Sequence, residues 1–360
     1  MKNGNTLIIA EAGVNHNGDM KLAKRLIDVA AKAGADIVKF QTFKAKKLAA
    51  VSADQAEYQA KNTGKAESQL EMLKRLELKY DDHFILADYC KNKEILFLST
   101  AFDEDSLAFL VDELDQKLLK IPSGEITNAP LLLAHARTGL DIILSTGMAT
   151  LSEIEIALGI LAFGFCNNAE EAPSIENFEK AYYSDEGKAY LNNKVSILHC
   201  TTEYPAPLVD INLRAMETIE YAFKLPVGYS DHSEGIIVPL VAVSKGAKIL
   251  EKHFTLDQNM DGPDHKASLE PKDLEKMISQ IRQIEVINGD GVKGPRPSEI
   301  KNKSIARKSI VAACPVQKGE IFTEDNLAIK RPGNGISPIN YWDVIGKQAI
   351  KDFEEDELII

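Results

Sequence analysis

Two histidines near the ends of apolar runs have the residue type and placement for a metal site. His232 closes the run PVGYSDH, and His253 lies within ILEKHFT. Two imidazoles without a neighbouring thiolate suit a divalent ion such as Mn²⁺, Fe²⁺ or Zn²⁺ that keeps positions open for oxygen ligands. Such an ion can activate a carbonyl as a Lewis acid. The alternative is that each histidine is a hydrogen-bonded core residue.

Hydrogen-bond donors stand at the ends of several other apolar runs. Ammonium and hydroxyl groups in one place suit an anion that carries phosphate. The donors are Lys39, Thr100, Lys120, Ser123, Ser145 and Ser230. The simpler interpretation is a set of solvated polar strand ends.

Carboxylates complete the set of residues that could do chemistry. Glu11 and Glu125 follow apolar runs, where burial can raise a pKa and permit proton transfer, although each could instead bond loop amides. Asp264 and His265 could bind a sugar hydroxyl, or Asp264 could be a turn residue. Asn15 and His16 are expected to be structural.

The elements that must position these residues repeat along the chain. Short β-rich runs alternate with amphipathic helical segments, a pattern typical of a parallel sheet. The runs are 7–13, 36–42, 95–102, 118–125, 141–148, 195–204, 226–232 and 249–255. We therefore expect an α/β fold, a (β/α)₈ TIM barrel, with these polar residues converging on one mouth.

Alternation along a strand assigns the faces of GYSDH. Ser230 and His232 are two residues apart and share one face, toward the barrel mouth. Asp231 then points the other way or supports the metal site from beneath. Cys200 follows His199 and is conceivable as a nucleophile, but adjacent residues on a strand point to opposite faces.

Three regions follow from composition. Residues 1–290 are expected to form the barrel, with extra structure within 43–92 and an insertion within 164–194. Residues 291–303 are rich in Gly, Pro and Lys and are read as a linker. Residues 304–360 are expected to be a small β-rich domain with a thin core.

Charge and composition exclude several classes. The net charge of −12 argues against non-specific nucleic-acid binding, which needs a basic surface. No apolar run is long enough for a membrane span, and the N-terminus lacks a signal-peptide pattern. Four well-separated cysteines without a CxxC motif suggest reduced thiols, so we expect a cytoplasmic protein.

Taken in order, the motifs resemble those of the bacterial sialic acid synthases, which condense phosphoenolpyruvate with a sugar to make nonulosonic acids. The resemblance rests on IAEAGVNHNGD, VKFQTFKA, STAFD, KIPSGEITN, LSTGMA, LHCTTEYPAP, GYSDHS, EKHFTLD, GPDHKASLEP and KRPGNGISP. It covers essentially the whole chain, including a C-terminal antifreeze-like (SAF) domain.

The resemblance implies roles for named residues. His232 and His253 correspond to the metal ligands, normally for Mn²⁺, with Mg²⁺ or Co²⁺ as alternatives. The six donors given above correspond to phosphoenolpyruvate contacts. Residues around the acceptor sugar and the attacking water are Glu11, Gln41, Glu125, Tyr204 and Asp264. Arg331 corresponds to the SAF-domain arginine that reaches the other subunit's active site, which implies a domain-swapped homodimer.

The resemblance leaves the acceptor sugar undecided. The expected activity is N-acetylneuraminate synthesis from N-acetylmannosamine, and the segment 56–82 resembles the enzymes with that activity. However, Thr201 and Thr202 stand where those enzymes often have an Asn, and TTEYPAP resembles N,N′-diacetyllegionaminate synthases, which use 2,4-diacetamido-2,4,6-trideoxymannose. Ala101 replaces a usual Pro, which should alter rigidity more than chemistry.

Two other functions remain open. A Schiff-base lyase would use Lys39 or Lys120 as nucleophile, would need no metal and would be trapped by borohydride. A non-catalytic carbohydrate-binding protein would bind sugar without releasing phosphate, and its histidines would be dispensable.

Overall fold

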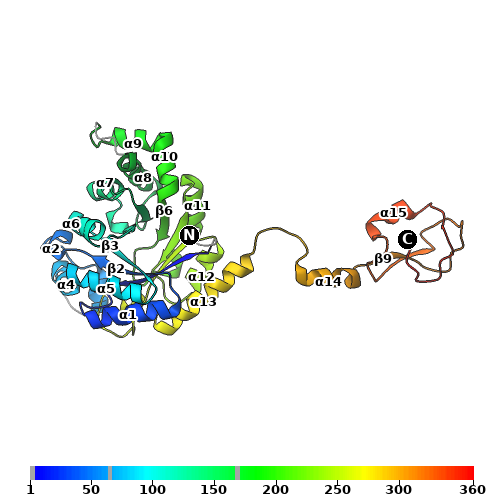
Figure 1. The fold of residues 1–360 in the computed structure, drawn as a ribbon, viewed down its shortest axis with the longest axis horizontal. Coiled ribbons are helices and arrows are strands. Elements are labelled where there is room, and N and C mark those ends of the chain that lie inside the picture. Colours follow the sequence, from blue (N-terminus) through cyan, green and yellow to red (C-terminus); the bar gives the residue numbers. More distant parts are fainter. Residues whose placement is uncertain (1–4, 64–66, 167–170) are drawn as a thin grey trace. The chain divides into compact units, whose positions relative to one another are not determined.

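The computed structural model describes residues 5–63, 67–166 and 171–360. Some positions of the predicted barrel and insertion lie outside the described residues. They are 1–4, 64–66 and 167–170. The chain forms two compact units, Met1–Gly289 and Asp290–Ile360, which are described separately (Figure 1). No helix in the described residues is long and apolar enough to cross a membrane.

The first unit contains the predicted eight-stranded parallel sheet, which confirms the TIM-like fold. The order of hydrogen-bonded neighbours is β3-β2-β1-β8-β7-β6-β5-β4. The strands are β1 (Leu7–Gly13), β2 (Ile37–Thr42), β3 (Leu96–Ala101), β4 (Leu118–Ile121), β5 (Asp141–Ser145), β6 (Val195–Cys200), β7 (Val227–Asp231) and β8 (Ile249–His253).

A glutamine side chain closes the barrel where β3 and β4 lie side by side. The Gln116 amide oxygen accepts from the Ser99 backbone N–H at 2.7 Å. Its amide nitrogen donates to the Ser99 and Leu118 carbonyls at 3.0 and 2.9 Å. This buried side chain satisfies backbone groups that a regular strand ladder would otherwise pair.

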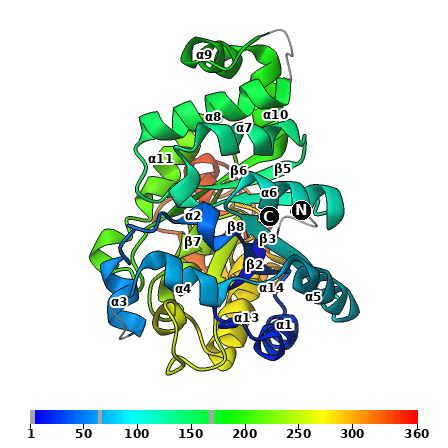
Figure 2. The same ribbon diagram turned by 90° about the vertical axis from the view of Figure 1, so that its left-hand side faces the viewer.

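Helices surround the sheet (Figures 1 and 2). Those of the first unit are α1 (Met20–Ala33), α2 (Ala45–Leu48), α3 (Glu57–Thr63), α4 (Gln69–Leu76), α5 (Tyr80–Asn92), α6 (Glu104–Ala108), α7 (Ala129–Arg137), α8 (Leu151–Cys166), α9 (Ile175–Tyr183), α10 (Asp185–Lys194), α11 (Arg214–Phe223), α12 (Ile237–Ser244) and α13 (Pro271–Asn288). The π-helical turn η1 (Phe109–Glu113) continues α6, and the 3₁₀ turns of this unit are η2 (Ser123–Glu125), η3 (Leu208–Asp210) and η4 (His265–Ala267).

The two long connections carry the extra structure that their length predicted. The one after β2 contains α2, α3 and α4 before α5. It has its own hydrophobic cluster, which includes Phe43, Met72 and Leu76 and is distinct from the main core between sheet and helices. The connection before β6 carries α9 and α10, and Phe178 of α9 packs edge-on against Phe163 of α8.

The second unit has a smaller core around the antiparallel pair β9 (Ser309–Ala312) and β10 (Leu327–Lys330). Helix α14 (Pro297–Ala306) occupies much of the segment read as a linker. The remaining elements are η5 (Pro338–Asn340) and α15 (Tyr341–Val344). Isolated β-bridges, such as Val316 with Phe353, account for the β-rich character expected of this region.

Candidate active site

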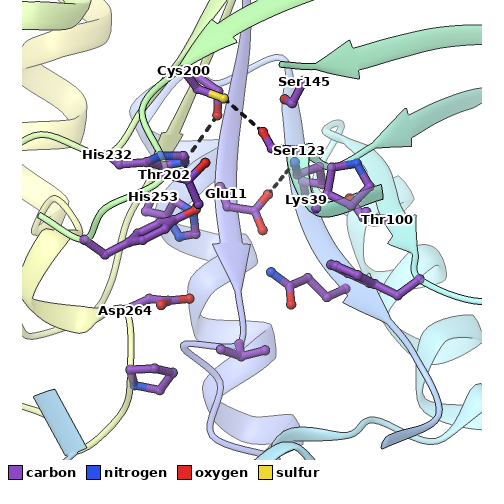
Figure 3. Close-up of a pocket in the computed structure, with 18 of the residues that line it drawn as sticks. Glu11, Lys39, Thr100, Ser123, Ser145, Cys200, Thr202, His232, His253 and Asp264 are labelled. Carbon is purple, nitrogen blue, oxygen red and sulfur yellow. Dashed lines mark hydrogen bonds and ion pairs between the residues drawn. The ribbon is translucent and has the colours of Figure 1, made fainter. Parts of the chain in front are cut away.

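A pocket of about 390 Å³ opens at the carboxyl ends of the strands (Figure 3). Every sequence-predicted site residue except His265 and Arg331 contributes to its lining. From the strands and the loops after them come Glu11, Lys39, Gln41, Thr100, Lys120, Ser123, Glu125, Ser145, Tyr204, Ser230, His232, His253 and Asp264. Residues distant in sequence therefore meet at one site.

Strand alternation explains why these residues meet. A layer of buried side chains fills the barrel interior: Ile9, Ile37, Leu98, Ile143, Leu198 and Ile249. Two residues further along each strand, on the same face, stand Glu11, Lys39, Thr100, Ser145, Cys200 and Glu251. An apolar floor thus carries a polar layer directly above it.

Gly228 occupies the corresponding floor position of β7. A Cβ at this residue would lie 2.3 Å from the Ile249 carbonyl oxygen and 2.7 Å from Leu198 Cδ2. Only glycine fits there, and the strand still delivers Ser230 and then His232 to the pocket.

The two histidines stand beside each other, with ring centroids 5.5 Å apart. His232 Nδ1 donates to the Thr201 carbonyl at 2.6 Å, so Nε2 carries the lone pair and accepts from the Tyr204 hydroxyl at 3.1 Å. Burial lowers the pKa of His232 to about 4 and that of His253 well below its usual value. Both rings are therefore neutral near pH 7, as metal ligands must be.

This donor set fits a divalent ion. His253 Nδ1 is buried and has no hydrogen-bond partner among the described residues. The described chain holds no cluster of three or more His, Cys, Asp and Glu side chains that could bind a metal. Protein ligands would therefore be limited to the two imidazoles, and the remaining positions would be open to water and substrate oxygens.

Lys39 lies between two carboxylates beneath the histidines. Its Nζ is 3.0 Å from Glu11 Oε2 and donates to Glu251 Oε2 at 2.5 Å. Burial alone would lower the pKa of Lys39, but Glu11 and Glu251 raise it, so the ammonium stays charged. Burial raises the pKa of Glu11 against the opposing effect of Lys39.

Glu251 is the ionised member of this group. Burial would raise its pKa, but Lys120 and Lys39 hold it well below the usual value, and the Ser230 hydroxyl donates to it at 2.9 Å. The strand-end pattern predicts Glu251 at the barrel mouth but assigns it no role. Only the fold shows that Glu251 joins Lys39 to Ser230.

Lys120 supplies the second cation of the polar layer. Its Nζ donates to Ser145 Oγ at 2.6 Å and to the Ile121 carbonyl at 3.1 Å. Burial lowers its pKa to about 8, with Glu251 opposing the shift. The lysine is therefore mostly charged near neutral pH and directed into the pocket.

Ser123, Cys200 and Thr202 form a cluster of small polar groups in the pocket lining. Ser123 Oγ accepts from the Gly147 N–H at 2.9 Å and lies 3.1 Å from Cys200 Sγ. Thr202 Oγ1 is buried nearby without a partner among the described residues. Burial raises the pKa of the Cys200 thiol, which makes it a poor nucleophile. The strand-end pattern predicts Thr202 at the barrel mouth but assigns it no role.

Aromatic rings extend from the two histidines toward the pocket entrance. The Tyr204 ring lies against His232 at a tilt of 33°, with centroids 4.2 Å apart, and Tyr58 of α3 stacks on Tyr204 at 5.1 Å. Burial raises the pKa of nearby Asp264 to about 6. Tyr58 lies in the long connection after β2, where no strand-end pattern could have indicated it.

Asp231 points away from the pocket, which decides between its two predicted positions. Its Oδ2 accepts from Lys252 Nζ at 2.6 Å, and both side chains are fully buried. Its Oδ1 accepts from the Ser233 N–H and hydroxyl at 3.1 and 2.8 Å. The pair joins β7 to β8 on the face opposite the histidines.

The other predicted residues lie at or beyond the pocket edge. Glu125 lines the pocket and accepts from Asn128 Nδ2 at 2.7 Å. His265 is buried against Thr255, 2.7 Å from its hydroxyl, and is not a lining residue. Asn15 donates to the Phe254 carbonyl at 2.8 Å, a structural contact as expected. Arg331 belongs to the second unit, where its Nε donates to the Ala306 carbonyl at 3.1 Å.

Comparison with known proteins identifies a family and a C-terminal domain. The NeuB family matches residues 26–293, and the SAF domain matches residues 307–359. The chain is 52% identical over 98% of its length to the N,N′-diacetyllegionaminic acid synthase of Campylobacter jejuni, with 98% of that protein covered. It is 43% identical over 95% of its length to the synthase of the same name from Legionella pneumophila, with 89% covered.

A solved structure extends the comparison to the fold. The N-acetylneuraminic acid synthetase of Leptospira borgpetersenii matches with a TM-score of 0.66 and 36% identity, over 83% of this chain and 90% of that one. The family match spans most of the barrel, and the relatives are similar over nearly the whole chain. This chain is therefore an enzyme of the NeuB family with a C-terminal SAF domain.

Proposed function

We propose that the protein is an N,N′-diacetyllegionaminate synthase. It would condense phosphoenolpyruvate with 2,4-diacetamido-2,4,6-trideoxymannose and water, releasing phosphate. The names and high identity of the Campylobacter and Legionella relatives support this acceptor over N-acetylmannosamine. The N-acetylneuraminate activity expected first from the sequence becomes the second candidate, supported by the more distant Leptospira structure.

One observation carries the reaction class: two buried lysines and several hydroxyls converge beneath two neutral histidines in a single pocket. Lys39 and Lys120 would bind the carboxylate and phosphate of phosphoenolpyruvate, with Ser145 and Thr100 as further donors. The Thr100 hydroxyl is buried without a partner among the described residues, so a ligand oxygen would satisfy it. These contacts would fix the enol carbon beside the acceptor aldehyde.

His232 and His253 would hold a divalent ion, for which Mn²⁺ is our proposal and Mg²⁺ or Co²⁺ are the alternatives. When bound, the ion would polarise the acceptor aldehyde as a Lewis acid. The Thr201 carbonyl fixes the His232 tautomer and ring orientation, a common arrangement behind histidine ligands.

The bond changes follow from this arrangement. C3 of phosphoenolpyruvate attacks the aldehyde carbon, and the aldehyde oxygen takes a proton. Water adds to C2, and the C–O bond to phosphate then breaks to leave a ketone. Glu11, whose pKa is raised by burial, would exchange the water's proton, with Glu125 as the other candidate.

The defining experiment measures phosphate release together with product mass. Purified protein receives phosphoenolpyruvate, Mn²⁺ and either acceptor, with a chelator control. We expect chelator-sensitive release with the diacetamido sugar and the mass of diacetyllegionaminate. Preferred turnover of N-acetylmannosamine would support the second candidate function, N-acetylneuraminate synthesis. Metal-independent turnover with a borohydride-trapped lysine would instead support the Schiff-base lyase.

We also propose that Arg331 completes the active site of a second copy, as the family resemblance implies. Its guanidinium is exposed, and among the described residues its hydrogen bond runs from Nε to the Ala306 carbonyl. A free guanidinium can recognise the carbonyl of an N-acetyl group by hydrogen bonding. The swapped homodimer is thus part of the proposed function.

A further inference from the structure

The entrance side of the pocket differs in chemistry from the polar layer on the strands. Beyond the ends of β1, β2 and β3, most of the lining is apolar: Val14, Leu48, Met72, Leu73, Leu76 and Phe102. We call Leu48, Met72, Leu73 and Leu76, which come from the connection after β2, the apolar wall. The polar layer that we assign to phosphoenolpyruvate lies within the strands themselves.

Helix α4 builds most of this wall with one face. Gln69, Met72, Leu73 and Leu76 are spaced i, i+3, i+4 and i+7, which aligns them along a single side of a helix. All four line the pocket. The helix therefore presents a continuous apolar surface with one amide at its N-terminal end.

Contacts with neighbouring elements hold α4 in place before any ligand binds. Ser68 caps the helix by accepting from the Glu71 N–H. Glu77, directly after the helix, accepts from the Ala45 N–H of α2 at 2.9 Å. Gly18, in the loop after β1, packs so closely that a Cβ there would lie 2.6 Å from the Arg75 carbonyl oxygen. The wall is a fixed part of the pocket.

The sheet order sets the wall apart from the proposed metal ligands. The histidines end β7 and β8, whereas the wall rises beyond β2 and contacts residues that follow β1 and β3. An acceptor whose aldehyde meets the histidines would direct its far carbons toward the entrance. The chemistry of those carbons distinguishes the two candidate sugars.

We infer that the apolar wall selects an acceptor that carries a methyl and an acetamido group at the end remote from its aldehyde. This inference rests on the proposed function and deepens it. In the diacetamido sugar, C6 is a methyl and C4 carries an acetamide; in N-acetylmannosamine both positions carry hydroxyls. Hydroxyls against leucine and methionine would lose water without gaining partners. Gln69 offers an amide to the second acetamide.

The test compares both acceptors in wild type and in Leu73→Asn. The readout is the ratio of kcat/KM for the diacetamido sugar to kcat/KM for N-acetylmannosamine, measured by phosphate release. We expect wild type to favour the diacetamido sugar by about 10- to 100-fold, which is the range an apolar pocket can supply. Leu73→Asn should reduce that ratio by about tenfold and leave the KM for phosphoenolpyruvate unchanged.

Leu70→Asn is the matched control. Leu70 lies on the same helix and in the same cluster, and its exposure of 7% resembles the 9% of Leu73, but it does not line the pocket. It should lose similar stability and keep the wild-type ratio. If Leu73→Asn does not fold, Leu48→Gln, at a half-buried lining position, replaces it.

The outcomes separate the inference from the proposed function. If wild type prefers the diacetamido sugar but the lining variants keep that ratio, or Leu70→Asn shifts it equally, the inference fails and the proposed function stands. If wild type prefers N-acetylmannosamine, both fail. A ratio that falls only in the lining variants supports both.

Discussion

At the scale of single residues, Gly147 packs tightly behind three side chains that line the pocket. A Cβ at this position would lie 2.2 Å from Thr202 Oγ1, 2.9 Å from Ser123 Oγ and 3.0 Å from Cys200 Sγ. Gly147→Ala should therefore displace Ser123, which we assign to phosphoenolpyruvate. We expect kcat/KM for phosphoenolpyruvate to fall at least tenfold, corresponding to about 1.4 kcal/mol.

Gly124→Ala provides the comparison, because Gly124 lines the pocket but a Cβ there would meet nothing within 4 Å. This variant should remain close to wild type. Equal loss of activity in both variants would show that flexibility of these loops, and not space around Ser123, is what matters.

Asp264 makes the stability of the folded protein depend on pH. Burial raises its pKa from 3.8 to about 6, so the folded protein binds this proton more tightly than the unfolded chain does. Stability must then fall as pH rises from about 4 to about 6, and the cost persists above that range. Asp264→Asn should be more stable than wild type at pH 7, by up to about 3 kcal/mol, but not near pH 4.

Denaturant unfolding at both pH values checks this, with Asp261→Asn as an exposed control from the same loop. The control should match wild type at both. An Asp264→Asn advantage of the same size at pH 4 would mean that the gain does not come from removing a buried charge. Activity should fall if Asp264 contacts the acceptor as proposed.

Many of the pocket residues could be predicted from sequence, because a strand places alternate residues on one face. Lys39, Ser145 and His253 each follow an apolar run at that spacing. The role of Glu251 could not be predicted, since its partners Lys39 and Ser230 come from other strands. Roles assigned from the family resemblance stay predictions until variants are assayed.

At the scale of elements, the buried pair of Lys252 and Asp231 fixes β7 against β8 behind the histidines. Lys252→Met would leave Asp231 as an uncompensated buried charge. We expect a loss of about 3–5 kcal/mol in the free energy of unfolding. The double variant Lys252→Met/Asp231→Asn removes both charges and should recover much of that loss, as measured by denaturant unfolding.

The exposed pair of Lys245 and Glu217 serves as a control, and Lys245→Met should cost no more than about 1 kcal/mol. If the double variant were as unstable as Lys252→Met, the loss would arise from packing of the lysine stem and not from the unpaired carboxylate. Metal content of the double variant would then show whether strand pairing alone positions His232 and His253.

The eight strands could be predicted because apolar runs bounded by polar residues recur between amphipathic segments. The closure by Gln116 could not, since one glutamine near Leu118 gives no signal that it will bond Ser99 on another strand. The helix α14 was also missed, because Gly and Pro before it dominate the composition of 291–303.

At the scale of the whole molecule, the proposal for Arg331 predicts complementation between subunits. Arg331→Ala and His232→Ala should each be inactive alone. When the two are unfolded together and refolded, mixed dimers would contain one site with both native residues, and activity should return. If Arg331 acted within its own chain, no site in a mixed dimer would be complete and the mixture would stay inactive.

The acceptor was the part of the function that sequence motifs left open. TTEYPAP favoured the diacetamido sugar and segment 56–82 favoured N-acetylmannosamine. Relatives at 52% and 43% identity shift the proposal to the former. The motifs did not identify the acceptor sugar, because they carry the shared phosphoenolpyruvate chemistry. Acceptor choice depends instead on residues outside those motifs.

The separate hydrophobic cluster after β2 has a consequence for how such an enzyme can diverge. Because α2 and α4 pack mainly on their own cluster, substitutions there are absorbed locally and leave the barrel core intact. The polar layer on the strands keeps its geometry meanwhile. Substitutions in this one connection can therefore give descendants of a single ancestor new sugars to use while they inherit the same polar layer.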